Sequence, residues 1–344
     1  FRLTLDGYEP IDLVRSFLSL TQQTELAHAG FDYQNDASYA IDVRLTPAGA
    51  LPEGMVRVAG GLYATVPLLG FAQLDPRMIP EFYIDRTEVT NAAFAEFVQA
   101  GGYTDERWWR DAVADGDPEV GVTEALGRFV DATGRPGPAG WTLGAPPEDL
   151  ADHPVTGVSW FEATAYCQWR GAALPTLYHW ARAALPSAGA WVPFSPTLAA
   201  RSNLDGTGTV PVGSLDAISI AGAQDMLGNA REWTSTASID GRYLLGASWA
   251  DPEYFVSDSN APSPWHRTDG DGFRCAQFGD DPVPPALLEP LTFPTQVFSA
   301  RPTLSDEVFE ATAQFYAYDP AQPLGARVDS TATHPDGWSV EWVS

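Results

Sequence analysis

The stretch that decides the fold reads Asp225-Met226-Leu227-Gly228-Asn229-Ala230-Arg231-Glu232-Trp233-Thr234. Glycine and asparagine tolerate left-handed backbone angles, so Gly228 and Asn229 predict a sharp turn before a strand-like run. Trp233 can bury a large ring beside that turn. One interpretation is a plain turn with a core tryptophan. The other is that oxygens of Asn229 and Glu232 hold a hard cation.

The same stretch resembles the signature Asp-Met-x-Gly-Asn-x-x-Glu-Trp of the formylglycine-generating enzyme family, whose members are also called sulfatase-modifying factors. Other segments of the family follow in its order, at residues 55–61, 82–91, 153–160, 165–167, 174–176 and 272–276. This ordered set covers residues 52–278 and is far more specific than any single motif. The resemblance implies an α+β fold of the C-type-lectin-like kind, rich in irregular loops.

The composition is strongly acidic, with 45 Asp and Glu against 19 basic residues and a formal net charge of −26. Such a surface repels nucleic acid and anionic membranes, and it favours metal cations and basic partners. The alternative is that the acidic surface serves solubility or reflects a salty habitat. No run of 18 apolar residues occurs, so the sequence predicts no membrane-spanning segment.

The sequence divides into three parts. Residues 1–51 hold a partial β segment and a linker, and the alternation before Asp6 and Gly7 resembles the end of a PEGA-type β domain. Residues 52–279 form the family domain. Residues 280–344 begin with a Pro-rich linker and continue as an extended tail with strand-like runs. We expect the chain to be a fragment of a larger bacterial protein, with missing domains on both sides.

Local signals predict the regular elements of the family domain. Strands are expected at residues 55–58 and 82–85, and helices at 91–99, 160–170 and 177–185. Thr90 and Thr176 are the expected N-caps, and Ser159 with Glu162 fits a capping box. The Gly and Pro content of residues 108–152 predicts an insertion without regular structure.

The resemblance also implies an activity, the oxidation of a peptidyl cysteine by copper that a pair of thiols holds. This chain has two cysteines, Cys167 and Cys275, and Asp251 and Val256 stand where the resemblance places the thiols. A carboxylate is a hard donor that does not suit Cu(I). We therefore expect no copper, no formylglycine-generating activity and no catalytic residue from this set.

The two cysteines match the positions of a structural bridge in the family, so the resemblance implies a disulfide between Cys167 and Cys275. The alternative is a pair of buried free thiols, because a bridge persists only in an oxidising compartment. With the bridge, we expect an extracytoplasmic protein, in the periplasm or at the cell surface.

The resemblance implies structural calcium as well. The matching positions are Asn203, Leu204 and Asp205 in one segment, and Gly228, Asn229, Ala230 and Glu232 in the other. Calcium takes about six to eight oxygen ligands, both carboxylates and carbonyls. We expect a Ca²⁺ ion at the second segment, which keeps more of the family pattern than the first.

The loop between Ser248 and Gly272 carries the candidate ligand groove. Its residues are Trp249, Asp251, Glu253, Tyr254, Phe255, Trp265, His266 and Arg267. Aromatic residues and arginine are favoured at binding surfaces. The alternative is that half of these side chains belong to the core.

Three functions remain open from the sequence. The first is a non-catalytic ligand-binding, protein-binding or sensor module. The second is a metal-dependent oxidoreductase that uses Asp251, Glu253 and His266, and the third is a structural spacer. We favour the first, with a protein or peptide ligand, no nucleic acid and no membrane insertion.

Overall fold

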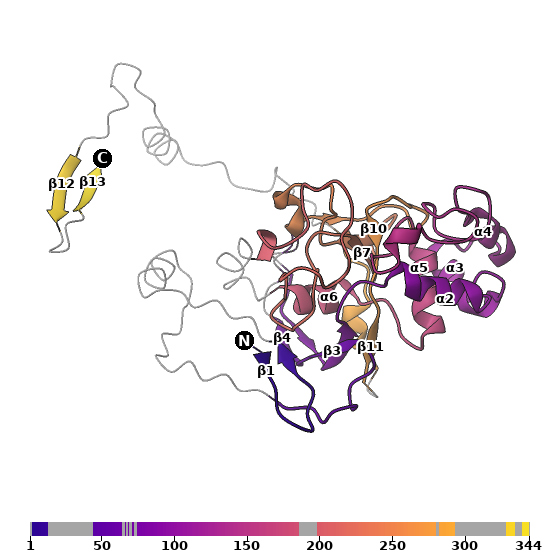
Figure 1. The fold of residues 1–344 in the computed structure, drawn as a ribbon, viewed down its shortest axis with the longest axis horizontal. Coiled ribbons are helices and arrows are strands. Elements are labelled where there is room, and N and C mark those ends of the chain that lie inside the picture. Colours follow the sequence, from indigo (N-terminus) through magenta and orange to yellow (C-terminus); the bar gives the residue numbers. More distant parts are fainter. Residues whose placement is uncertain are drawn as a thin grey trace, which may run out of the picture. The chain divides into compact units, whose positions relative to one another are not determined.

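A computed structural model of the chain describes residues 2–12, 44–63, 66, 68, 71, 74–185, 198–279, 282–292, 328–333 and 339–343. The chain forms two compact units, Phe1–Phe293 and Pro294–Ser344, and each is described by itself. Figure 1 shows the larger unit as a mixture of short helices and short strands joined by long loops.

Two sheets position the stretch around Gly228. One has the strand order β11 (Ala276–Phe278), β6 (Phe82–Asp85) and β3 (Met55–Val58), and both of its pairings are antiparallel. The other has the order β10 (Asp271–Gly272), β7 (Arg231–Ala237), β8 (Arg242–Leu245) and β9 (Ser259–Asn260). In the second sheet β10 runs parallel to β7, with Asp271 opposite Arg231. Residues about 40 positions apart in sequence therefore meet at one sheet edge.

Two smaller antiparallel pairs belong to the same unit. They are β4 (Gly61–Tyr63) with β5 (Arg77–Ile79), and β1 (Arg2–Leu3) with β2 (Ile11–Asp12). The turn expected at Asp6 and Gly7 lies between β1 and β2. In the smaller unit, β12 (Val328–Thr333) pairs antiparallel with β13 (Ser339–Val343).

The three helices expected in the family domain are confirmed. They are α2 (Asn91–Gln99), α5 (Trp160–Trp169) and α6 (Leu177–Ala184). The Thr90 and Thr176 side chains each accept a hydrogen bond from a backbone N–H of the first turn. The capping box is complete, because Ser159 and Glu162 each accept from the other's backbone N–H. Side chains thus satisfy backbone donors that helix geometry leaves without partners.

The insertion contains regular helices, so the expectation of irregular structure there is wrong. Its elements are η1 (Glu106–Trp108), α3 (Arg110–Gly116), α4 (Val122–Arg128) and η2 (Glu148–Leu150). Burial of Trp109, which stacks on Phe129 with 5.2 Å between ring centroids, anchors these helices. At Gly116 a Cβ atom would lie 2.6 Å from the Phe161 ring, so glycine there permits close packing of α3 on α5. Tertiary burial overrides the local breaker signal.

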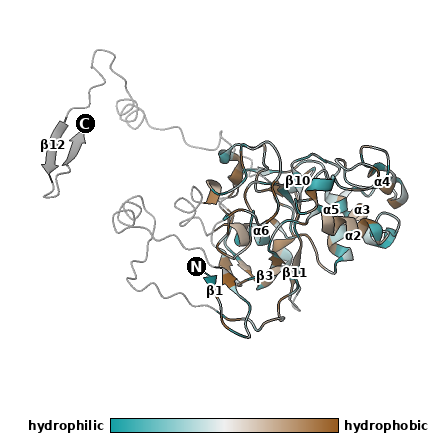
Figure 2. Cartoon of the chain, in the orientation of Figure 1, coloured by the Kyte–Doolittle hydropathy of each residue, from teal (hydrophilic) through white to brown (hydrophobic). Residues whose placement is uncertain are grey.

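The core of the larger unit consists of two apolar groups. One packs around α6 and the inner side chains of β6, and the other packs around α2 and α5. Figure 2 shows hydrophobic residues spread over both the helices and the strands of this unit. Two short 3₁₀ turns, η3 (Glu253–Ser257) and η4 (Pro285–Leu287), complete the elements. Among the described residues, no helix has the length and apolar character that crossing a membrane requires.

Candidate functional site

The turn at Gly228 and Asn229 is left-handed as predicted, with φ angles of 79° and 62°. A Cβ atom at Gly228 would lie 2.5 Å from the carbonyl oxygen of Asn203, so no larger residue fits without a backbone shift. The Asn229 backbone N–H donates to that same oxygen at 2.9 Å. The two segments expected to bind calcium therefore lie directly against each other.

The Asn229 side chain is fully buried and occupied by protein partners. Its Oδ1 accepts from the Val210 backbone N–H at 2.9 Å and from Asn203 Nδ2 at 3.2 Å. Its Nδ2 donates to Glu88 Oε1 at 3.0 Å. Asn229 thus joins three chain segments through its side-chain amide.

Glu232 forms a buried ion pair with Arg274. The Arg274 Nε donates to Oε2 and its Nη2 to Oε1, each at 2.7 Å, and the Trp180 indole donates to Oε2 at 2.7 Å. Neither charged side chain has any exposed surface. Both carboxylate oxygens of Glu232 are therefore occupied, and the residue could bind a cation only by sharing an oxygen that Arg274 already holds.

Two buried oxygens beside this pair have no hydrogen-bond partner among the described residues, Oε2 of Glu88 and Oδ1 of Asp225. Burial raises the pKa of the Glu88, Asp225 and Glu232 carboxyls, and the charge of Asp225 raises that of Glu88 further. Three carboxylates face one guanidinium, so full ionisation leaves two surplus negative charges in the interior. Either protons or a divalent cation must offset them.

A calcium ion near Glu88, Asp225 and Glu232 would offset the surplus negative charge of these three carboxylates. Asp225 opens the quoted stretch, and the sequence did not mark it as a candidate ligand, because only the fold brings it near Glu88. Within the described ranges, no three His, Cys, Asp or Glu side chains gather closely enough to hold a metal by themselves. An ion here would therefore take most of its ligands from backbone carbonyls. The calcium site stays a prediction.

The first expected calcium segment also has other partners. The Asn203 side chain donates to the Gly208 carbonyl at 3.0 Å, and Leu204 packs against the core. Asp205 is left-handed with a φ angle of 49°, and its N–H donates to the Asp251 carbonyl at 3.0 Å. These contacts tie the segment to the candidate groove.

Within that groove, a chain of charged groups surrounds Arg231. We call it the Arg231 cluster, and it consists of Arg231, Ser248, Asp251, His266 and Asp271. Asp251 pairs with Arg231 and accepts from the Ser248 N–H at 2.7 Å and hydroxyl at 2.8 Å. On the other side, Arg231 Nη1 lies 3.6 Å from Asp271 Oδ1, and His266 Nε2 lies 3.3 Å from Asp271 Oδ2.

Sequence reasoning named Asp251 and His266 but missed Arg231 and Asp271. The two missed residues face each other only because β10 runs parallel to β7. Asp271 is fully buried, and burial raises its pKa, whereas Thr268, His266 and Arg231 stabilise the anion. His266 and Arg231 are partly exposed, with 40% and 24% of their side-chain surface accessible, so the cluster meets solvent through these two groups.

Two other residues of the expected groove, Trp265 and Arg267, make contacts inside the protein. Trp265 packs on Phe161 with 4.4 Å between centroids, and its indole donates to Asp117 at 3.0 Å. Arg267 pairs with the fully buried Glu162 at 2.9 Å. Both side chains therefore connect the loop between Ser248 and Gly272 to the insertion and to α5. For these two residues the alternative stated above, that half of the groove residues belong to the core, holds.

The remaining groove residues divide between surface and core. Trp249 is half-buried, and its indole donates to the Asp269 carbonyl at 3.3 Å. Glu253 and Tyr254 are exposed, the latter at 73%. Phe255 packs against the core. Of the expected groove residues, Trp249, Glu253, Tyr254 and His266 thus reach solvent, and with the exposed side of Arg231 we call this set the accessible part of the candidate groove.

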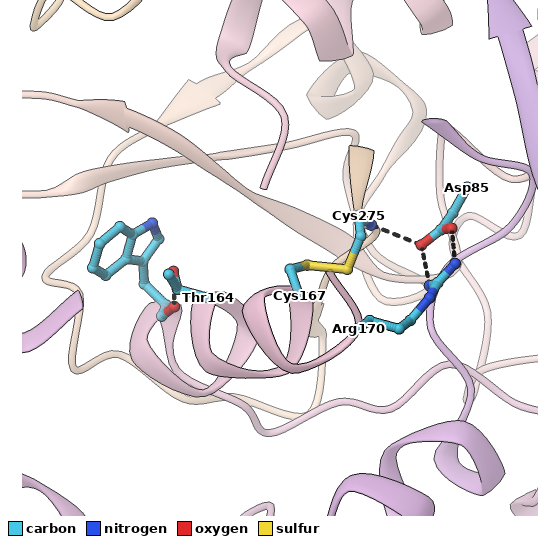
Figure 3. The surroundings of a disulfide bond; sticks show 6 residues. Asp85, Thr164, Cys167, Arg170 and Cys275 are labelled. Atoms are coloured by element: carbon cyan, nitrogen blue, oxygen red, sulfur yellow. Dashed lines mark hydrogen bonds and ion pairs between the residues drawn. A yellow bond between two sulfur atoms is a disulfide. The ribbon is translucent and has the colours of Figure 1, made fainter. Parts of the chain in front are cut away.

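The Cys167–Cys275 bridge is confirmed, with 5.6 Å between Cα atoms and a sequence separation of 108. Figure 3 shows Asp85 beside it, accepting from the Cys275 N–H and from Arg170 of the helix end. The bridge uses both cysteines of the chain. Asp85 and Arg170 therefore brace the strand and the helix that the disulfide joins.

Comparison with known proteins matches residues 44–278 to the sulfatase-modifying factor enzyme 1-like domain. A hercynine oxygenase of Mycolicibacterium thermoresistibile is 39% identical over 50% of this chain and 45% of that protein. An inactive Cα-formylglycine-generating enzyme 2 of Mus musculus is 31% identical over 70% of this chain and 90% of that protein. A formylglycine-generating enzyme of Streptomyces coelicolor is 37% identical over 38% of this chain and 46% of that protein.

The chain spans about half the length of the hercynine oxygenases that it matches. The matched segment contains β3, β6, α5, β7 and the Cys167–Cys275 bridge. The α+β fold expected from the ordered motifs is therefore confirmed. The chain belongs to the family of sulfatase-modifying factor enzyme 1-like domains.

Proposed function

We propose that this domain is a non-catalytic binding module that retains the family fold and does not generate formylglycine. The observation that carries the proposal is the pairing of Asp251 with Arg231 and Ser248. Asp251 stands where the resemblance places a copper thiol, and here its oxygens serve a charge network. Since the disulfide uses both cysteines, the chain has no free thiol to hold Cu(I) in the way that the resemblance implies.

The proposed ligand is a protein or peptide with basic groups, bound at the accessible part of the candidate groove. The chain as a whole carries a net charge of −26, and the exposed Glu253 adds a carboxylate close to Asp251 in sequence, so the surface favours a basic partner. Trp249 and the exposed Tyr254 add aromatic surface, which favours contact with a cation or an aliphatic stem. The same charge disfavours nucleic acid.

Two structural features accompany this proposal. The bridge favours an oxidising compartment, which supports an extracytoplasmic site. The unpartnered Asp225 oxygen and the surplus negative charge favour a structural calcium ion near Gly228 and Ala230. The calcium would stabilise the turn that places Arg231 at the start of β7.

A Cu(I) titration tests the proposal. The wild-type chain should hold no copper at stoichiometric affinity. The variant Asp251→Cys with Val256→Cys restores the two thiols at the positions that the resemblance indicates, and it should gain one site. Tight stoichiometric Cu(I) binding by the wild-type chain would overturn the proposal, whatever the variant does.

A metal-dependent oxidoreductase is the second candidate, and the 39% identity to a hercynine oxygenase favours it. Against it, the Asp251 oxygens are occupied, and Glu253 and His266 form no metal group with Asp251 among the described residues. Titration with Fe(II), Mn(II) and Cu(II) separates the candidates. One stoichiometric site that Asp251→Asn removes would favour the enzyme.

A structural spacer is the third candidate function. It predicts that altering residues 249–267 abolishes no partner binding.

A further inference from the structure

A cavity of about 290 Å³ lies outside the Arg231 cluster, at the start of β6 and the end of β11. Its lining residues are Pro80, Glu81, Phe82, Tyr83, His179, Phe278, Gly279, Val283 and Pro284. Most of these are aromatic or aliphatic, so the walls favour an apolar body. Pro80 and Gly279 are exposed and mark its mouth.

His179 is the polar group inside this apolar lining. The residue is 1% exposed and sits between two rings, with centroid distances of 4.7 Å to Phe82 and 4.6 Å to Phe278. Its Nδ1 lies 2.7 Å from Thr176 Oγ1. Its Nε2 has no hydrogen-bond partner among the described residues. Nε2 is not among the fully buried side-chain atoms without a partner, so it keeps contact with solvent in the cavity, and a ligand that accepts from it would replace a water molecule.

We assign the tautomer of this imidazole from its contact with Thr176. Thr176 Oγ1 already accepts the His179 backbone N–H as the N-cap of α6, so its own hydrogen is free to be donated to Nδ1. Burial lowers the pKa of His179 to about 3, so the ring is neutral at physiological pH. In a neutral ring whose Nδ1 accepts, Nε2 carries the proton and is a donor.

No uncompensated charge lines the cavity among the described residues. The Glu81 carboxylate pairs with Arg57 at 2.8 Å and with Arg44 at 3.5 Å. Among the described lining residues, a charged ligand would find no opposite charge without a partner of its own to offset its lost hydration. The volume is roughly twice the 150 Å³ of an apolar cavity that accommodates benzene, so one substituted ring fits.

We propose that this cavity binds a small, uncharged, planar molecule, about one aromatic ring in size, whose oxygen accepts a hydrogen bond from Nε2 of His179. The partly exposed Tyr83 and Phe278 flank the ring, and Nε2 of His179 fixes its orientation. The site does not depend on the function proposed for the Arg231 cluster, because the two share no residue.

The probe is 4-fluorobenzamide, titrated into the 344-residue chain and followed by ¹⁹F NMR. Its ring matches the walls and its carbonyl matches the donor. 4-Fluorotoluene is the control, because it has a similar size and no acceptor. We expect the benzamide to bind about tenfold more tightly than the toluene, which is the ordinary value of one net hydrogen bond.

The variant His179→Phe keeps an aromatic side chain and removes the donor, so it should abolish the tenfold preference. His153→Phe, which removes a histidine outside the cavity, should keep it. A second measurement needs no variant. In wild-type protein labelled with ¹⁵N-histidine, the probe should shift an imidazole that stays neutral between about pH 5 and 8, as expected of His179.

The results that would overturn the proposal are specific. They are saturable binding of neither probe, equal affinity for both probes, or a probe-induced shift confined to a histidine that titrates in that range. If His179→Phe does not fold, the ¹⁵N measurement on the wild-type chain decides.

Discussion

Arg274 donates to both carboxylate oxygens of Glu232 in the interior, at 2.7 Å each. The two residues are 42 positions apart, and the same guanidinium also donates to the Asp85, Arg86 and Gln224 carbonyls. One buried side chain thus joins the stretch around Gly228 to β6 and to the segment that carries Cys275.

Arg274→Met should therefore destabilise the fold strongly. It leaves Glu232 charged and unpaired beside Glu88 and Asp225, and breaking a buried pair in this way costs about 3–5 kcal/mol. Urea unfolding measures the change. The control Arg128→Met removes an exposed pair with Glu124 and should change stability by less than about 1 kcal/mol. A loss below about 1 kcal/mol for Arg274→Met would contradict this account.

The disulfide predicts a second stability change. Replacing Cys167 and Cys275 by alanine opens a loop with a sequence separation of 108. The chain-entropy model gives about 4.7 kcal/mol for roughly 100 residues, and measured values are more often about 2–4 kcal/mol. Thermal unfolding of wild type and variant, each with and without reductant, measures it. Reductant should shift the wild type alone, and two titratable thiols in denatured, unreduced protein would exclude the bridge.

His179 predicts a pH dependence. Burial lowers its pKa from 6.5 to about 3, so in the native state it stays neutral while the unfolded chain takes up a proton. Stability is therefore lost as pH falls below 6.5, by about 1.4 kcal/mol per pH unit. His179→Gln removes this proton linkage. The difference in unfolding free energy between wild type and variant should change by about 2 kcal/mol between pH 6.5 and 5, and a constant difference would refute the assignment.

Calcium should stabilise the chain through the stretch around Gly228. Binding to the folded state alone adds about 2.7 kcal/mol at a hundredfold excess over the dissociation constant. Adding chelator should lower the melting temperature, and Asp225→Asn should remove most of the calcium response. Glu253→Gln, an exposed carboxylate elsewhere, is the matched control. An equal response of wild type and Asp225→Asn would place the ion elsewhere, and no response to chelator would exclude it.

Local signals in the sequence predicted the elements that local chemistry determines. The caps at Thr90, Ser159 and Thr176 and the turn at Gly228 depend on neighbouring backbone groups, which a sequence displays directly. The Cys167–Cys275 bridge came from the family resemblance, not from spacing.

The candidate site was harder to predict because its contacts join distant segments. Arg231 meets Asp251 and Asp271 only after β7, β8 and β10 have formed one sheet, and nothing near Arg231 in sequence signals either partner. The sequence could not show that Trp265 and Arg267 make internal contacts whereas Trp249 is partly exposed. An aromatic residue or an arginine occurs both in cores and on surfaces, and its identity alone does not distinguish the two places. The pairing of Arg267 with buried Glu162 decides that question.

The central claim is that this family domain does not generate formylglycine. The most direct test incubates the 344-residue chain with copper, oxygen, a thiol reductant and a Cys-x-Pro-x-Arg peptide, followed by mass spectrometry of the peptide. A formylglycine-generating enzyme, such as the Streptomyces coelicolor relative, is the positive control. We expect unchanged peptide at every time point, and time-dependent conversion of its cysteine to the aldehyde would show that the domain is active.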